Sequence, residues 1–257
     1  MKRSPPKIAL CAAYANGYTL VDFVLREDHP IEFIVTCNKD TSEYEEKIAA
    51  LCEKKGIPCL RKMDANSPAV IEELKKRSID LVLLLWWPGI IKGEAIAAAT
   101  IGWINLHTSL LPYNRGMYPY YWAIVEGTPF GATLHFINEK IDAGAILFQR
   151  EIPIAITDTG ESLYARLMET ALDLFKTNYH KITRLDFTPR EQEKTKVTFH
   201  LAKDIEPHSQ IDLEKAYRAR ELLDIIRART FWNGNSAYFF KDGKKYWVRI
   251  DITEATS

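Results

Sequence analysis

Three polar side chains stand where strands are predicted to end. Asn105 and His107 are two positions apart in an apolar stretch, so on a strand both point to the same face at its carboxyl end. Asp142 lies in a short loop between two further apolar stretches, where Gly144 lets the backbone turn tightly. Each feature alone is more often structural than catalytic. Together, an amide, an imidazole and a carboxylate at strand ends suggest acyl transfer without a protein nucleophile.

This set of groups fits the direct attack of an amine on a formyl or amide carbonyl. The attack creates an oxyanion, which a carboxamide N–H and an imidazolium stabilise, and removal of one such donor typically lowers the rate by about 10²–10³. A carboxylate beside the imidazole fixes its orientation and favours its charged form. Proton transfer from the amine is general acid–base catalysis, which contributes roughly 10²–10⁴. No serine elbow or candidate reactive cysteine accompanies the three side chains.

The elements that must position these groups alternate between short apolar runs and helical stretches. Continuous apolar strands indicate a sheet that is covered on both faces, as in a Rossmann-like open parallel sheet flanked by helices, an α/β fold. Such sheets bind ligands beyond the carboxyl ends of their strands. The predicted strands are 8–13, 31–37, 57–60, 80–87, 101–107, 130–137 and 145–150, and the predicted helices are 18–26, 42–55, 67–76, 118–126 and 161–184.

A second, smaller module is expected after a polar linker at residues 186–195. It is predicted to be a C-terminal α+β module with a strand at 197–201, a helix at 213–229 capped by Asp212, and a β-hairpin. The hairpin joins 238–240 to 246–250 through Asp242-Gly243, with Tyr238 and Phe240 facing Tyr246 and Val248. We therefore expect residues 1–185 to form the catalytic domain and 186–257 a module for dimerisation or substrate support.

Composition narrows the function further. The chain of 257 residues has 34 basic and 34 acidic side chains, a balance that argues against a nucleic-acid partner. Its four cysteines form no CxxC pair, so we expect no metal site and a reducing compartment. The N-terminus leads into an apolar run too short for a signal peptide or membrane span, and we expect a cytoplasmic protein without a membrane partner. A single glycine after the first strand, Gly17, signals no dinucleotide site.

Three motifs also resemble a known family. Asn105-x-His107-x-Ser109-Leu110-Leu111-Pro112, Gly131-x-Thr133-x-His135 and Asp142-x-Gly144 are similar in order and approximate spacing to the folate-dependent formyltransferases. The resemblance covers nearly the whole chain. It implies that Asn105, His107 and Asp142 form the catalytic triad that moves a formyl group from 10-formyltetrahydrofolate to an amine. It implies folate binding by an apolar strand end and the loop before Gly144, with the candidates Leu84, Trp86, Ile90, Ile91, Glu139, Ile141 and Asp142.

The chain also departs from that family pattern. Thr108 stands where the family usually has proline, which changes no chemical group. Leu201 and Ala202 replace the arginines usual after the histidine at 200, and residues 231–235 replace a proline-rich stretch. Substrate contacts in the second module are therefore expected to differ from those of other family members.

The amine that accepts the formyl group is suggested by the residues after the first motif. Residues 111–126 look like those of sugar N-formyltransferases, which act on nucleotide-linked amino sugars such as dTDP- or UDP-amino-dideoxy sugars and imply a role in lipopolysaccharide or surface-glycan biosynthesis. A nucleotide needs a cation for its pyrophosphate and an aromatic surface for its base. The candidate cations are Arg115 and Arg229, and the candidate aromatic residues are Tyr113, Phe231 and Trp232.

Three alternatives stay open. A methionyl-tRNA formyltransferase usually has a larger, often basic tail than this short, near-neutral one. A glycinamide ribonucleotide formyltransferase carries a glycine-rich phosphate loop that residues 13–18 lack. The third alternative is a non-catalytic folate- or sugar-binding module. The related sugar enzymes suggest a homodimer built by the C-terminal hairpin, although the hairpin is equally expected to pack back on the catalytic domain.

Overall fold

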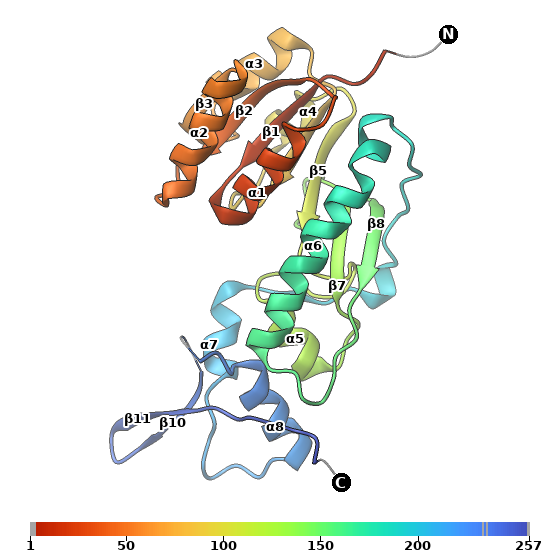
Figure 1. Ribbon diagram of the computed structural model, residues 1–257. Helices are drawn as coiled ribbons and strands as arrows, with labels where there is room; N and C mark the ends of the chain where they lie inside the picture. Colours follow the sequence, from red (N-terminus) through yellow and green to blue (C-terminus); the bar gives the residue numbers. More distant parts are fainter. Residues whose placement is uncertain (1–3, 233, 235, 256–257) are drawn as a thin grey trace. The chain divides into compact units, whose positions relative to one another are not determined.

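The computed structural model describes residues 4–232, 234 and 236–255 (Figure 1). Asn233 and Asn235, which lie in the stretch that departs from the family pattern, fall outside the described residues. The chain divides into two compact units. The first contains 1–107, 133–148 and 172–192, and the second contains 108–132, 149–171 and 193–257.

A seven-stranded sheet with the order β3-β2-β1-β4-β5-β7-β8 confirms the predicted α/β fold. The pairs from β3 to β5 are parallel, whereas β7 runs antiparallel to β5. The sheet is therefore mostly, but not wholly, parallel. Its strands are β1 (Ile8–Ala12), β2 (Ile31–Cys37), β3 (Cys59–Met63), β4 (Leu81–Leu85), β5 (Gly102–His107), β7 (Gly131–Phe136) and β8 (Ile146–Glu151).

Both faces of the central strands are buried, which explains their unbroken apolar sequences. Every residue of β1 and β4 is buried. Alternate residues such as Ala9, Val82 and Trp103 pack in one cluster with Val70 and Leu74. The helices of the first half are α1 (Tyr14–Val24), α2 (Glu43–Lys55), α3 (Pro68–Arg77) and α4 (Gly93–Ala97), the last of which the sequence analysis did not predict.

Local signals set the ends of α2 and α3. Ser42 caps α2 by accepting a hydrogen bond from the backbone N–H of Tyr44, and Gly56 ends the helix with a φ of 66°. Pro68 occupies the first turn of α3, where its missing N–H costs nothing. The predicted bounds of both helices agree with the structure to within a residue.

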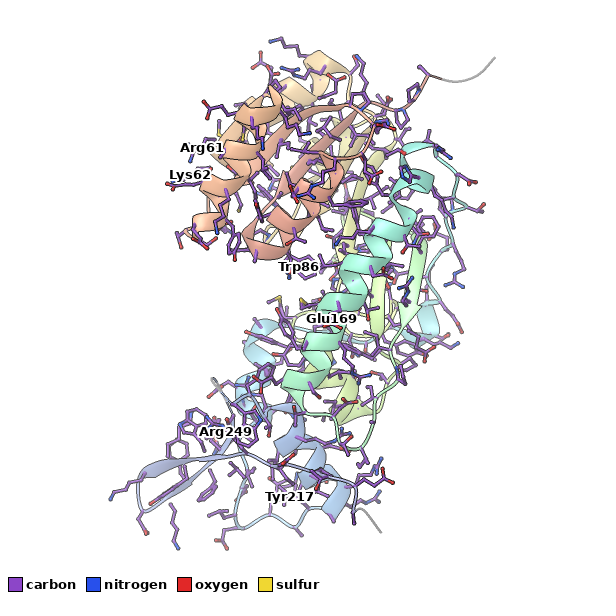
Figure 2. The ribbon with its side chains drawn as sticks, in the orientation of Figure 1. Arg61, Lys62, Trp86, Glu169, Tyr217 and Arg249 are labelled. Carbon is purple, nitrogen blue, oxygen red and sulfur yellow. The ribbon has the colours of Figure 1, made fainter. Side chains whose placement is uncertain are left out.

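A buried carboxylate ties α2 to the sheet. Glu45 is 1% exposed and accepts hydrogen bonds from Arg61 Nε and Nη2 at 3.0 and 2.7 Å and from Thr36 Oγ1 at 2.7 Å. Arg61 and Lys62 both come from β3, where Figure 2 shows them next to each other. The hydrogen bonds from Arg61 lower the pKa of Glu45 below its ordinary value of 4.5.

We expect Glu45→Gln to lower the free energy of unfolding at pH 7 by about 1–3 kcal/mol, because Arg61 and Thr36 then donate to a neutral amide or lose their acceptor instead of donating to a carboxylate. The native pKa of Glu45 is lowered, so its stabilisation is present above pH 4.5 and is lost as pH falls through the native pKa. Between pH 7 and pH 4 the variant should therefore lose less stability than the wild type in urea unfolding. Glu43→Gln, at an exposed helix pair with Lys47, is the control. Equal acid sensitivity of wild type and Glu45→Gln would contradict the assignment.

The first part of the polar segment predicted as a linker, residues 186–192, packs against the sheet. After α6 (Gly160–Thr183), the chain runs back alongside β8 (Figure 1). Arg190 and Ile146 exchange backbone hydrogen bonds of 2.8 Å in both directions, and the rings of Phe187 and Phe136 lie 5.9 Å apart. Residues 186–192, which the sequence predicted as a linker, therefore pack as part of the first unit.

The second unit holds α5, the C-terminal helix and the hairpin (Figure 1). Buried Ile211, Ile225, Ile226 and Ala237 form its small apolar core. Its helices and turns are α5 (Pro119–Glu126), η1 (Lys194–Lys196), η2 (Ala202–Asp204), α7 (Ile205–His208) and α8 (Ala219–Ala228). Its strands are β6 (Arg115–Gly116), β9 (Phe199–His200), β10 (Ala237–Lys241) and β11 (Lys244–Val248).

The prediction of a helix at 213–229 capped by Asp212 was wrong in its first third. The helix α8 begins at Ala219. The Asp212 side chain accepts a hydrogen bond from Glu214 N, and Asp212 N donates to the hydroxyl of Tyr217 at 3.0 Å. These bonds close a turn over residues 212–217, and this contact with a side chain five residues away competes with helix formation.

The hairpin exists, but its predicted pairing was wrong. Tyr238 lies opposite Trp247 and Phe240 opposite Lys245, while Tyr246 pairs with Phe239. The turn at Asp242-Gly243 has two positive φ values, 51° and 71°, and joins Lys241 directly to Lys244. This two-residue loop sets the register, so aromatic side chains lie on both faces of the hairpin.

Over the described residues, no helix combines the length and the apolar character needed to cross a membrane.

Candidate functional site

The structure brings Asn105, His107 and Asp142 together within the first unit. His107 Nδ1 lies 3.6 Å from Asp142 Oδ1. His135 Nε2 lies 3.9 Å from the same carboxylate oxygen and 3.3 Å from Asn105 Nδ2. The rings of His107 and His135 are nearly perpendicular, at 89°, with centroids 6.0 Å apart. One carboxylate therefore faces two imidazoles, and the Asn105 amide joins the group.

Sheet register accounts for this convergence. In the antiparallel pair β5–β7, Asn105 lies opposite His135 and His107 opposite Thr133. Opposed residues project from the same face, so both histidines and Asn105 meet there. His135 belongs to the motif Gly131-x-Thr133-x-His135, but the sequence predicted no catalytic role for it. Its alternation with Thr133 was a usable signal, but the pairing with Asn105 depends on a register that the sequence does not state.

The protons on His135 and Asn105 can be assigned from their partners. His135 Nδ1 lies 2.7 Å from the backbone carbonyl of Phe136, an acceptor, so Nδ1 carries a proton. Nε2 then accepts a hydrogen bond from the Asn105 amide. This bond orients the Asn105 side chain with its carboxamide nitrogen toward His135 and leaves the second N–H of that nitrogen for another acceptor.

The two ring nitrogens of His107 have different surroundings, since only Nδ1 faces Asp142. The Nε2 atom is buried and meets no hydrogen-bond partner within the described portion of the chain. A buried polar atom without a partner costs about 1–3 kcal/mol, so it usually marks a position that a ligand or water fills. His107 therefore has one nitrogen toward a carboxylate and the other available to a reacting group.

The Asp142 loop is held in a demanding conformation. Asp142 has a φ of 48°, in the left-handed region that non-glycine residues rarely adopt. A Cβ on Gly144 would lie 1.8 Å from the carbonyl oxygen of Phe136, so only glycine fits there. Gln192 donates hydrogen bonds to the backbone carbonyls of Asp142 and Gly144, at 2.8 and 2.7 Å. Gln192 lies in a polar stretch of the sequence, and no local pattern predicts a role for it.

The residues that the family resemblance suggested for folate binding differ in exposure. Leu84 and Ile91 are buried in the core cluster of the first unit. Trp86 follows β4 directly with a φ of 62° and is half-buried, and it is labelled in Figure 2. Ile90 and Ile141 are exposed large apolar side chains, and Glu139 is also exposed. A ligand could therefore contact Trp86, Ile90, Glu139 and Ile141. Leu84 and Ile91 are core residues that a ligand would not reach directly.

The suggested nucleotide-binding residues all lie in the second unit. Arg115 is half-buried on β6, opposite Phe199, and Tyr113 is half-buried. Arg229 is 4% exposed, and its Nη2 lies 3.3 Å from Glu206 Oε2. The ring of Phe231 packs 5.4 Å from that of Tyr120. Trp232 is the most exposed of the five, at 59%. Arg229 and Phe231 thus have internal partners, whereas Trp232 presents an open aromatic face.

Burial affects two side chains around α5. It raises the pKa of Tyr120 to about 12, with Arg229 opposing the rise, so this hydroxyl stays protonated at neutral pH. Burial also lowers the pKa of His208, whose Nδ1 lies 2.7 Å from the hydroxyl of Tyr121. These groups line the interior of the second unit. Among the residues that the structure describes, no cluster of His, Cys, Asp or Glu has the arrangement of a metal site.

Comparison with known proteins gives the family. The Formyl transferase model matches residues 24–177, more than half of the chain, and the N-formyltransferase dimerization C-terminal domain matches residues 204–254. A protein from Mycobacterium tuberculosis is 24% identical, with 98% of this chain and 100% of that one covered and a TM-score of 0.81. A sugar N-formyltransferase from a Shewanella species is 23% identical, with 97% of this chain and 99% of that one covered and a TM-score of 0.79.

A third similar structure contains ligands. It is an N-formyltransferase from Helicobacter canadensis in complex with folinic acid and dTDP-3-aminofucose, 20% identical, with 93% of this chain and 86% of that one covered and a TM-score of 0.72. At these identities the likeness establishes the fold, and the match of the family model establishes the relationship. The chain belongs to the formyl transferase family.

Proposed function

We propose that the protein transfers a formyl group from 10-formyltetrahydrofolate to the amine of a nucleotide-linked amino sugar. The observation that carries this proposal is the buried His107 Nε2, which has no partner in the described chain while Nδ1 of the same ring faces Asp142 at 3.6 Å. A structural histidine would satisfy both nitrogens. Here one nitrogen faces a carboxylate and the other is open to a reacting group, as a catalytic acid or base requires.

In this mechanism the amine attacks the formyl carbon directly. The new C–N bond forms as the carbonyl oxygen becomes an oxyanion, which the free N–H of Asn105 and the His107 ring stabilise. Asp142 orients the His107 ring and balances its charge. His107 or a water near it moves the proton from the attacking nitrogen to N10 of the folate, whose bond to the formyl carbon then breaks.

For the folate we propose the loop after β4 and the Asp142 loop. Trp86, Ile90 and Ile141 supply apolar surface, and the loop that contains Glu139 and Asp142 supplies backbone groups that can pair with the edge of a pterin. Leu84 and Ile91 are assigned a supporting role beneath this surface. The Helicobacter canadensis relative, which binds folinic acid, supports a reduced folate as the formyl donor.

For the acceptor we propose a nucleotide sugar. The same relative binds dTDP-3-aminofucose, and the second unit of this chain offers Trp232 as an exposed aromatic surface, with Arg115 and Tyr113 half-buried. Arg229 is proposed as a second cation for a phosphate, which would have to compete with the Glu206 carboxylate for the Arg229 guanidinium. A product of this kind would enter surface-glycan synthesis. The free thiols of Cys11, Cys37, Cys52 and Cys59 suit a reducing compartment, and we propose the cytoplasm.

The test is a formyl-transfer assay with several amines. Purified protein is incubated with 10-formyltetrahydrofolate and dTDP- or UDP-linked amino sugars, glycinamide ribonucleotide or methionyl-tRNA, and the formylated product is identified by mass spectrometry. Formylation of a nucleotide sugar supports the proposal. Formylation of only the ribonucleotide or the tRNA would contradict the acceptor. Folate binding without transfer to any of them would favour a binding module.

We also propose that the C-terminal part of the second unit, residues 193–257 and not the predicted 186–257, acts as a module whose hairpin builds a homodimer. Phe240, Tyr246 and Trp247 are each at least 43% exposed, more apolar surface than a short hairpin normally leaves in solvent. The match of residues 204–254 to a dimerization domain supports this. Light scattering at micromolar concentration should give twice the chain mass for the wild type and the single-chain mass for Trp247→Glu. Lys244→Glu is the control, and a monomeric wild type would contradict the proposal.

A further inference from the structure

We propose that Gln192 is a positioning residue that holds the Asp142 carboxylate in its place beside His107. This inference rests on the proposed function, because it concerns how the proposed catalytic group is oriented. Gln192 acts through the backbone of the Asp142 loop, to which its side chain donates two hydrogen bonds. It is therefore distinct from the three groups that face the reaction.

The contact uses both donors of one amide. Gln192 Nε2 lies 2.8 Å from the carbonyl oxygen of Asp142 and 2.7 Å from that of Gly144. A primary amide has two N–H groups, so one nitrogen can serve both carbonyls. Gln192 is 7% exposed, so these carbonyls have little access to water, and each would cost about 1–3 kcal/mol if its donor were removed.

The loop needs such an external restraint. Asp142 adopts a left-handed conformation with a φ of 48°, which typically costs a non-glycine residue about 1–2 kcal/mol. Within the loop, Lys140 N donates a hydrogen bond to Asn138 Oδ1 at 3.0 Å, and Ala143 N donates one to Lys140 O at 3.4 Å. The two bonds from Gln192 fix the orientation of the Asp142–Ala143 and Gly144–Ala145 peptide groups. The direction of the Asp142 side chain follows from that backbone.

Gln192 reaches the loop from a separate and well-fixed segment. Two residues before it, Arg190 exchanges two backbone hydrogen bonds of 2.8 Å with Ile146. Three residues earlier still, Phe187 packs on Phe136, the last residue of β7. Both ends of the Asp142 loop are thus attached to the segment that carries Gln192. A rigid support of this kind matters because a misplacement of about 1 Å at a reacting group can cost roughly 10² in rate.

The test removes both donors while keeping the volume, with Gln192→Met. We expect kcat to fall about 10- to 100-fold. The loss of two buried hydrogen bonds should also lower the melting temperature, so kcat is measured well below the unfolding transition of each variant. Asn178→Leu is the matched control, because Asn178 is also a buried amide that donates to a backbone carbonyl, that of Leu174, but lies on α6. An equal loss of kcat in Asn178→Leu would overturn the proposal.

A double-mutant cycle separates positioning from a general structural role. If Gln192 acts through Asp142, Gln192→Met should lower kcat by less than about threefold in an Asp142→Asn background, since coupled residues are not additive. The same 10- to 100-fold loss in both backgrounds would overturn the proposal. Gln192→Asn, which keeps the amide one methylene shorter, should retain more activity than Gln192→Met and serves as the test variant if Gln192→Met does not fold.

A second readout does not depend on activity. Backbone amide hydrogen exchange of a peptide covering residues 137–145 should be faster in Gln192→Met than in the wild type and unchanged in Asn178→Leu. If the wild type transfers no formyl group to any amine, the proposed function fails, but faster exchange still supports Gln192 as the restraint on this loop. Unchanged exchange in Gln192→Met would overturn the restraint whatever the activity.

Discussion

Replacing His107 by asparagine is expected to lower kcat by at least about 10³, because the variant loses both the proton-transfer group and one stabiliser of the oxyanion. Asn105→Ala should cost about 10²–10³, since it removes a single hydrogen-bond donor. Both side chains lie at the carboxyl end of β5, where β7 pairs with both residues and β4 pairs with Asn105. The fold should therefore survive both substitutions. Steady-state kinetics with the accepted amino sugar, together with circular dichroism, measures the two effects.

A second histidine provides the control for this experiment. His180 lies near the carboxyl end of α6 and is 57% exposed, with Nε2 at 2.9 Å from Glu27. His180→Asn should leave kcat within about threefold of the wild type, as most exposed substitutions do. If His107→Asn turned over at the wild-type rate, the catalytic assignment of His107 would be wrong, and with it the observation on which the proposed function depends.

Replacing Gly144 by alanine is expected to destabilise the protein by about 3 kcal/mol or more, through backbone strain at a close contact. The added Cβ would lie 1.8 Å from the carbonyl oxygen of Phe136 and 2.6 Å from its carbon, both of which are backbone atoms. The loop must therefore move, and the carboxylate of Asp142 moves with it. For a chain of this size the melting temperature should fall by about 6–12 °C, and the remaining folded protein should have a kcat at least tenfold below the wild type.

The matched control for this loop is Gly234→Ala. Among the residues that the structure describes, a Cβ at Gly234 meets Phe231 Cβ at 3.8 Å, an ordinary van der Waals contact. Its melting temperature should stay within about 2 °C of the wild type, since surface substitutions usually change stability by about 0.5 kcal/mol or less. A Gly144→Ala protein with wild-type stability and activity would show that the loop tolerates a shift, and the close approach would then have no role in orienting Asp142.

The central elements could be predicted because their signals are local. The apolar runs that become β1 and β4 contain no polar interruption, and the Ser42 cap and Gly56 mark both ends of α2. Departures occurred where a specific side-chain hydrogen bond or the geometry of a turn decided the outcome, and not the apolar pattern. Helix α8 starts six residues later than predicted, because Tyr217 closes a turn with Asp212, and a two-residue loop gives the hairpin a different register.

The sequence by itself determined the α/β architecture with its parallel strands from β1 to β5, and it singled out Asn105, His107 and Asp142 as candidate catalytic residues. It could do so because residue type, spacing along a strand and the position of a turn are all properties of adjacent residues. Only the tertiary structure decided that Asp142 faces two imidazoles, that His135 bonds to Asn105, and that Gln192 supports the loop from 48 residues further along the chain. Those contacts depend on strand register and on where α6 returns the chain. Both are set by the packing of the sheet as a whole and not by any local propensity.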